Sequence, residues 1–134
     1  MSPAEVLKAI LEEEASVTFV IKVNHLPDEP NDLIVINDRP NIIDGKVMSS
    51  GRVYEHPKLQ FIFRSLSYAT AYSQAKIVAD LLDSFWLRNY YGDSGHYVVR
   101  SAQRLGTIFS LGIDGKLRRS LVGLDYILDF KTES

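Results

Sequence analysis

The clearest pattern in the chain is an alternating stretch that runs directly into a helical one. From Leu59 to Arg64, strongly apolar positions alternate with mixed ones, which predicts a strand with one buried face. Ser67 follows, and its hydroxyl can accept from the free N–H groups of a first helical turn. We therefore assign Ser67 as the N-cap of a helix over Tyr68–Phe85. This unit, Glu55–Asp83, predicts the centre of the fold.

Apolar residues on the predicted helix recur at steps of three and four, which places them on one buried stripe. The stripe is predicted to consist of Ala71, Ala75, Val78, Leu82 and Phe85, broadened by Tyr72, Leu81 and Trp86. The polar residues that fall mostly outside it are assigned to the solvated face: Gln74, Lys76, Asp80 and Asp83. The small alanines come first, so the helix is expected to lie close to a sheet at its N-terminal end.

The first third of the chain predicts a helix followed by two strands. Ser2, Pro3 and Glu5 have the spacing of a capping box. The helix that follows buries Leu7, Ile10 and Leu11, and three acids at 12–14 oppose its macrodipole, so it is expected to fray or stop there. Alternation over 17–24 predicts a first strand. The apolar run 33–36 fits a strand buried on both sides, or an edge strand covered by a partner.

A long excursion is predicted between Asn37 and Gly51. This segment is rich in Asn, Asp, Pro, Gly and Ser, and a short strand around Val53 is expected to close it. Loops of this length in small domains are usually functional or mobile. We therefore interpret the segment as a candidate contact arm.

The last third predicts a connector and three strands. Leu87–His96 is interpreted as a polar and aromatic connector, and strands are expected from Tyr97 and over Thr107–Ile113. Asp114-Gly115 is typical of a two-residue type I′ hairpin turn, after which 117–130 returns as the longest strand. The apolar side chains of this strand share the core face, and its other face carries Arg119, Gly123, Asp125 and Asp129.

Together these elements predict one α+β domain over residues 1–134. Its sheet is mostly antiparallel and packs against two helices, with a long loop or arm and a C-terminal hairpin. The length of 134 residues suits a single core, and 46% hydrophobic with 24% charged residues is a globular composition. No apolar run approaches the roughly 20 residues of a membrane span, and a signal-peptide layout is absent. We expect a soluble protein with no membrane partner.

Charge and cysteine content exclude several classes of chemistry. With zero cysteines, the chain cannot form disulfides, thiol nucleophiles, zinc knuckles or iron–sulfur clusters. The formal net charge is −2 with both signs interspersed, which argues against a general electrostatic footprint for nucleic acid but leaves a local basic patch open. Sequence-specific nucleic-acid binding is therefore not expected.

No group of residues supports a reaction. Gly92-Asp93-Ser94-Gly95 matches the tetrapeptide around the nucleophile of trypsin-like proteases, but those enzymes need a far larger double barrel, so a turn is the better interpretation. The histidines, His25, His56 and His96, lack metal-ligand spacing, and Asp28, Asp38 and Asp44 lack the EF-hand pattern. Phosphate-binding glycine motifs are absent. We expect no enzyme activity, metal or cofactor.

Candidate contacts with other subunits or partners lie in the arm, the connector and the return strand. Tyrosines suit interfaces because they offer a large area with a polar tip. Arg118 and Arg119 could touch phosphates, although such arginines more often form salt bridges across an edge, and the charged face of the return strand could face solvent or a neighbouring subunit. The candidates are Asp38, Arg39, Asp44, Arg52, Tyr90, Tyr91, Arg118, Arg119, Asp125 and Asp129.

The order of elements and several short motifs resemble the tail terminator proteins of long-tailed bacteriophages, also called tail completion or minor capsid proteins. The resemblance rests on Phe61–Arg64, on Ser67-Tyr68 with Ala71-Tyr72 and Leu81-Leu82, on Leu111–Lys116, and on Leu124–Ile127. It covers about the last 75 residues well and the first 50 by order of elements. The aromatic connector and Lys116, where arginine is common, depart from the family pattern.

The resemblance implies a structural virion protein. Such proteins form a ring, typically hexameric, on the finished tail tube, stop its polymerisation and present a surface to the neck of the head. The implied partners are further copies of the chain, the tail tube protein and a neck or head-completion protein, while DNA passes through the ring. The implied location is the tail or neck of the virion, assembled in the host cytoplasm.

Two alternatives remain open at this level. A neck or head-completion adaptor would share the size, composition and ring symmetry of a terminator. A small α+β enzyme or ligand-binding domain would instead have an apolar pocket with convergent polar groups, near Tyr90, Tyr91 and His96.

Overall fold

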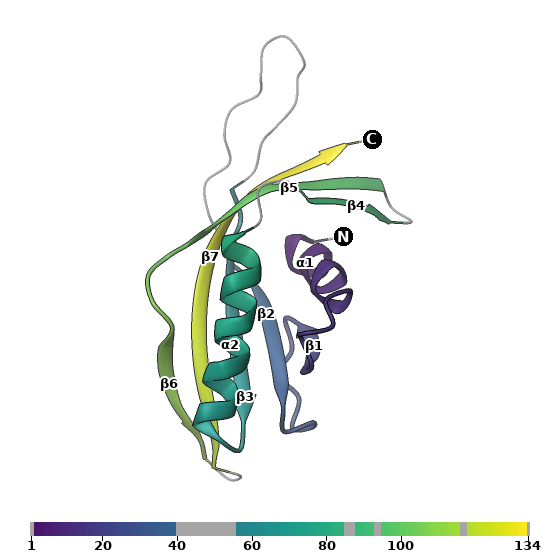
Figure 1. Cartoon of the computed structure of the whole chain (residues 1–134). Helices are drawn as coiled ribbons and strands as arrows, with labels where there is room; N and C mark the ends of the chain where they lie inside the picture. Colours follow the sequence, from purple (N-terminus) through teal and green to yellow (C-terminus); the bar gives the residue numbers. More distant parts are fainter. Residues whose placement is uncertain (1, 40–55, 85–87, 93–94, 116–117, 134) are drawn as a thin grey trace.

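The computed structural model describes residues 2–39, 56–84, 88–92, 95–115 and 118–133. The described residues form two helices and seven strands (Figure 1). In chain order these are α1 (Pro3–Glu12), β1 (Val20–Val23), β2 (Leu33–Arg39), β3 (Lys58–Ser65), α2 (Tyr68–Asp83), β4 (Arg88–Gly92), β5 (Gly95–Arg104), β6 (Phe109–Asp114) and β7 (Arg119–Glu133). The predicted α+β class is confirmed.

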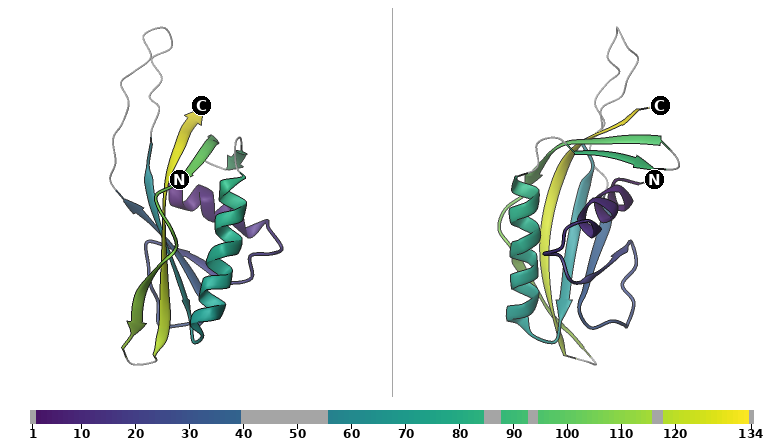
Figure 2. Two further views of the ribbon diagram at one scale, coloured as in Figure 1. Left: turned by 60° about the vertical axis from the view of Figure 1, so that its left-hand side comes forward. Right: turned by 45° about the vertical axis from the view of Figure 1, so that its right-hand side comes forward.

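The strands form one curled, mixed sheet in the order β1-β2-β3-β7-β5-β4, with β6 also paired to β7. Only β1 and β2 run parallel, and all the other pairs are antiparallel. The long strand β7 has β3 along one edge, while β6 and then β5 share its other edge. Both helices lie on the same face of the sheet (Figure 2). We call this the helix face and the other the open face.

The central unit folds as its pattern predicts. Leu59, Phe61 and Phe63 are fully buried on the helix face, and Ser67 caps α2 by accepting from the amide of Thr70 at 3.4 Å. The predicted buried residues Ala71, Ala75, Val78 and Leu82 are all confirmed. The predicted stripe positions Phe85 and Trp86 lie outside the described residues.

Two positions on α2 contradict the predicted stripe. Tyr72, assigned to the core, is 42% exposed, and its ring lies 6.1 Å from that of Tyr68 on the outer surface. Gln74, assigned to the solvated face, is buried, and its Oε1 accepts from the amides of Thr18 and Phe19, both at 3.1 Å. The glutamine therefore ties α2 to the segment before β1. It also explains why β1 begins later than the predicted strand, because these two amides are bonded to a side chain.

The first third of the chain is otherwise as expected. The capping box of α1 is present, the helix ends at Glu12, and Leu7, Ile10 and Leu11 are buried. Leu33–Ile36 is buried on both faces, which favours the first of the two interpretations of this strand. The predicted start of the arm at Asn37 is wrong, because β2 continues to Arg39 and β3 pairs with it along its whole length. Residues 40–55, with most of the predicted arm and the strand around Val53, lie outside the described residues.

The predicted connector Leu87–His96 is wrong, because most of it belongs to two paired strands and β5 begins at Gly95. Residues 88–92 form β4, which pairs with β5 from Arg88↔Val99 to Gly92↔Gly95. The hairpin passes beside α1 (Figure 1), where Tyr90 and Lys8 line one hollow. A register shift between Val99 and Ser101 separates this part of β5 from the part that runs along β7.

The predicted two-residue turn at Asp114-Gly115 is also wrong. The last pair of the β6–β7 ladder is Asp114↔Arg119, so residues 115–118 connect the strands. Arg118, the last residue of this connection, has φ 51°. The longer connection shifts the start of β7 from the predicted Leu117 to Arg119.

Gly123 fixes how β6 sits against β7. Phe109 is its direct partner in the ladder, and a Cβ at position 123 would lie 2.5 and 2.6 Å from two atoms of the Phe109 ring and 3.2 Å from Leu111. The missing side chain therefore leaves the space that the Phe109 ring occupies on the open face of β7.

Gly123→Ala is expected to lower the free energy of unfolding by about 1–3 kcal/mol, because the added methyl group forces the Phe109 ring out of its place. Urea denaturation measures this loss. Gly115→Ala is the control, since a Cβ there meets nothing within 4 Å, and we expect a change within about 0.5 kcal/mol. Equal losses in the two variants would contradict the packing role of Gly123.

Candidate assembly surfaces

The ten predicted contact residues do not form one site. Asp44 and Arg52 lie outside the described residues. The other eight divide between the open face of the sheet, the start of α1, the β4–β5 hairpin and the start of β7.

Arg39 and Asp125 come together on the open face. The sheet register places Gln60 opposite Asp125, and Lys58 opposite Arg39. These four side chains line a hollow of about 190 Å³, in which Nη2 of Arg39 donates to Oε1 of Gln60 at 2.7 Å. Oδ1 of Asp125 is buried here and has no hydrogen-bond partner among the described residues.

Asp129 occupies the same face of β7, four residues further on. Its Oδ2 lies 3.7 Å from Nε of Arg100, while its Oδ1 is buried without a hydrogen-bond partner among the described residues. Asp125 and Asp129 are both partly exposed, so this face of β7 presents two carboxylate side chains.

The carboxylate of Asp38 is occupied inside the chain. Its Oδ1 accepts from the amide of Ala4 at 3.1 Å, and its Oδ2 accepts from Nδ2 of Asn24 at 2.9 Å. The amide of Asp38 donates to Oδ1 of Asn24 at 2.9 Å. Asp38 therefore joins the first turn of α1 to the end of β2.

The two tyrosines of β4 have different environments. Tyr90 is partly buried and packs against the core, with its ring 6.5 Å from that of Tyr97. Tyr91 is 75% exposed, and its ring stacks on that of His96 at 4.2 Å. His96 in turn contacts Oδ1 of Asn89 through Nε2 at 2.8 Å. Of the pair, Tyr91 is the one that presents its side chain outward.

Arg119 corrects the expectation of a charged surface at the start of β7. Its side chain is only 2% exposed and donates to the carbonyl of Asp28, whereas the neighbouring Arg118 is exposed. Arg64 on β3 is similarly buried and donates to the carbonyl of Pro30 at 2.7 Å. The two guanidinium groups hold the segment 24–32 against the open face. Sequence reasoning assigned Arg119 to a surface and gave Arg64 no role, because these partners lie far away in the chain.

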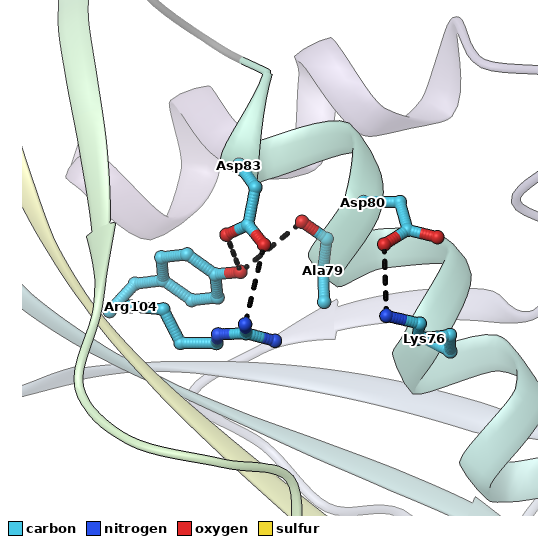
Figure 3. Close-up of polar contacts among 6 residues, drawn as sticks. Lys76, Ala79, Asp80, Asp83 and Arg104 are labelled. Atoms are coloured by element: carbon cyan, nitrogen blue, oxygen red, sulfur yellow. Dashed lines mark hydrogen bonds and ion pairs between the residues drawn. The ribbon is translucent and has the colours of Figure 1, made fainter.

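A polar cluster joins the end of α2 to β7 and β5. The hydroxyl of Tyr126 donates to Oδ1 of Asp83 at 2.9 Å, and Oδ2 of Asp83 lies 3.6 Å from Nη2 of Arg104 (Figure 3). Burial of the Tyr126 phenol raises its pKa above the ordinary value, and the bond to Asp83 raises the pKa further. Asp83 was assigned to solvent from the helical pattern, and its bond to Tyr126 is formed only when the helix packs on β7.

Tyr126 should make stability fall at alkaline pH. The folded state raises the tyrosine pKa, so its contribution is complete below the unfolded value of about 10 and is lost as pH rises above it. Urea unfolding of the native chain and of Tyr126→Phe between pH 8 and about 11 measures the difference. The Phe variant lacks this ionisation, so the stability of the native chain relative to it should fall across the range. A constant difference would contradict the role of Tyr126.

The two hollows of largest volume among those described are open to solvent. One of about 500 Å³ is lined by Glu5, Lys8, Ala9, Glu12, Val23 and Tyr90, and another of about 480 Å³ by residues 28–31. Neither is lined by Tyr91 or His96, where the ligand-binding alternative places its pocket. Among the described residues there is no cluster of three potential metal ligands. Within the same part of the chain, neither helix is long and apolar enough to cross a membrane.

Large apolar side chains are exposed mainly where two strands reach the lower end of the domain in Figure 1. At the β3–α2 corner these are Leu66 (60% exposed), Tyr68 (48%) and Tyr72 (42%). On β6 they are Leu111 (41%) and Ile113 (68%). The sequence analysis assigned none of these five residues to a contact surface.

Comparison with known proteins gives the family. The model of the family described as bacteriophage tail terminator protein matches residues 12–118. This range runs from the last residue of α1 to the residue before β7 and includes seven of the nine elements described, β1 to β6 with α2. The chain matches no curated protein at a significant level. The resemblance seen in the sequence is confirmed, and the chain belongs to the bacteriophage tail terminator proteins.

Proposed function

We propose that this protein is the ring-forming terminator of a phage tail. It caps the finished tail tube, stops tube polymerisation and provides the surface to which the neck of the head joins. The observation that carries the proposal is the family match over residues 12–118, which supports a structural role in the tail. Membership of this family also argues against enzyme activity, because the role of a tail terminator protein is a structural one in tail assembly.

The surfaces of the domain support a role with several partners. The lower end carries exposed apolar and aromatic side chains, whereas the open face carries the charged hollow around Arg39 and Asp125. Surfaces of different chemistry suit a subunit that contacts its own copies, the tube and the neck at separate places. Asp125, Asp129, Arg39, Arg118 and Tyr91 remain described candidates for these contacts. Arg119 does not, because it is buried.

The assembly that we propose is a closed homo-oligomer, most simply a hexamer, built from one domain per chain. Its partners are the tail tube protein and a neck or head-completion protein, and DNA passes through the ring without sequence-specific contact. It assembles in the host cytoplasm, becomes part of the virion and requires no cofactor.

The test is a tube-polymerisation assay. Tube protein of the same phage is polymerised with and without the purified chain, and tube lengths and ends are measured by negative-stain electron microscopy. We expect shorter tubes that bear a ring at one end. Tubes of unchanged length without a ring would overturn the proposal. Co-purification with portal-bearing heads instead of tubes would identify a neck adaptor.

A further inference from the structure

Strand β6 has one unused edge. It pairs with β7 along Phe109–Asp114, and no other strand of the described chain pairs with it. A strand edge of this kind presents backbone N–H and C=O groups that can pair with another strand. Because the Phe109 ring fills the space over Gly123, β6 is held firmly in the position that presents this edge.

The edge of β6 lacks most of the usual protection. Monomeric proteins block exposed edges with lysine, proline, bulges or covering segments. Residues 109–114 contain neither lysine nor proline, and they expose Leu111 and Ile113, at 41% and 68%. The strand itself has two protective features, a register shift between Ser110 and Gly112 and the charged residue Asp114. The exposed apolar side chains favour a partner over solvent.

The opposite border of the same sheet is β1, which pairs only with β2 among the described strands. Val20 is 45% exposed there, and Lys22 is also exposed. Lys22 is the only charged residue of β1, and Asp114 is the only one of β6, so the two short strands have complementary formal charges as well as exposed apolar side chains. The third border, β4, also carries one basic residue, Arg88, but it lies beside α1 of the same chain (Figure 1).

We infer that the edge of β6 in one copy pairs with the edge of β1 in the next copy, so that the sheet continues from subunit to subunit. The two edges are different surfaces of the chain, which makes the contact heterologous, and a heterologous contact generates a ring when its rotation closes. Pairing of β6 with β6 would stop at a dimer. This inference rests on the proposed ring and adds the surfaces that build it.

Cysteine cross-linking tests the pairing directly, because the chain contains no cysteine. Val20 and Leu111 both lie on the open face: Val20 is paired with Leu33, and Leu111 approaches the Cβ position of Gly123. The double variant Val20→Cys/Leu111→Cys is mixed with tail tubes and treated with a short bis-maleimide. We expect a ladder of covalent oligomers that ends at the closed ring. Each single variant should remain monomeric, and so should Tyr91→Cys/Leu111→Cys, which places the second thiol on β4.

A substitution at the edge gives an independent readout. Ile113→Lys adds a lysine to an exposed position and should abolish the ring at the tube end while leaving the thermal melting curve within a few degrees of the native one. Leu105→Lys, at an exposed apolar position outside the lower end of the domain, should keep the ring.

The outcomes separate this inference from the proposed function. If the native chain forms rings but Val20→Cys/Leu111→Cys gives no ladder, the β6–β1 pairing is wrong and the terminator function stays intact. The same conclusion follows if Ile113→Lys still forms rings. Covalent dimers of Leu111→Cys alone would show a β6–β6 contact and overturn it too. Failure of the native chain to form any ring on tubes would overturn both.

Discussion

Replacing Phe61 with alanine should lower the free energy of unfolding by about 3–5 kcal/mol. Phe61 is fully buried, its ring stacks on Phe63 at 6.3 Å, and it meets the edge of Tyr126 at 5.8 Å. The truncation removes these contacts and leaves a cavity between β3, β7 and the helices. Urea denaturation monitored by far-UV circular dichroism gives the loss as a lower midpoint at an unchanged slope.

Tyr72→Ala is the matched control for Phe61→Ala. Both substitutions truncate an aromatic side chain, but Tyr72 is 42% exposed on α2. We expect a change within about 0.5 kcal/mol, as for most surface positions. A loss as large as that of Phe61→Ala would restore the core position that the helical pattern predicted for Tyr72.

Replacing Arg119 with alanine should lower the free energy of unfolding by about 1.5–3 kcal/mol, the usual range for hydrogen bonds of charged groups. The buried guanidinium donates to the carbonyl of Asp28, which lies 91 residues away in the chain. Without it, the segment 24–32 loses one of its two arginine contacts. Limited proteolysis should then cleave this segment faster in the variant than in the native chain.

Arg118→Ala is the matched control, since Arg118 is adjacent in sequence and exposed. Its free energy of unfolding should stay within about 0.5 kcal/mol of the native value. If Arg118→Ala lost as much stability as Arg119→Ala, the assignment of Arg119 as the internal anchor would be wrong. Asp129→Ala is then the variant that tests the candidate assembly surface on the open face. Its Oδ1 has no hydrogen-bond partner among the described residues, so this variant does not disturb the contacts that Arg119 makes.

Local signals predicted much of the fold. The capping box of α1, the N-cap of α2 and the alternation of β3 depend on residues within a few positions of one another. Such interactions are readable from one sequence because both partners are nearby. The β4–β5 hairpin was missed because Tyr90, Tyr91 and His96 do not give a clear apolar and polar alternation.

Buried polar residues account for the main errors. Gln74 is buried because its side chain accepts from amides about 56 residues away, and Arg64 and Arg119 are buried because distant carbonyls accept from them. A side chain of this type is placed at the surface by its polarity unless its partner is known. For the same reason, the candidate contacts included Asp38 and Arg119, whose polar groups are used inside the chain.

The order of the strands along the chain affects how the sheet is made, because β7 follows all of its partners. Strands β3, β5 and β6 are all synthesised before β7, the strand with which each of them pairs. Until residues 119–133 leave the ribosome, these strands keep unpaired edges, and pairing across a long sequence separation is slow. The sheet therefore forms only after β7 has been synthesised. A chain that stops before β7 has no completed sheet, so an interrupted product keeps unpaired edges on β3, β5 and β6.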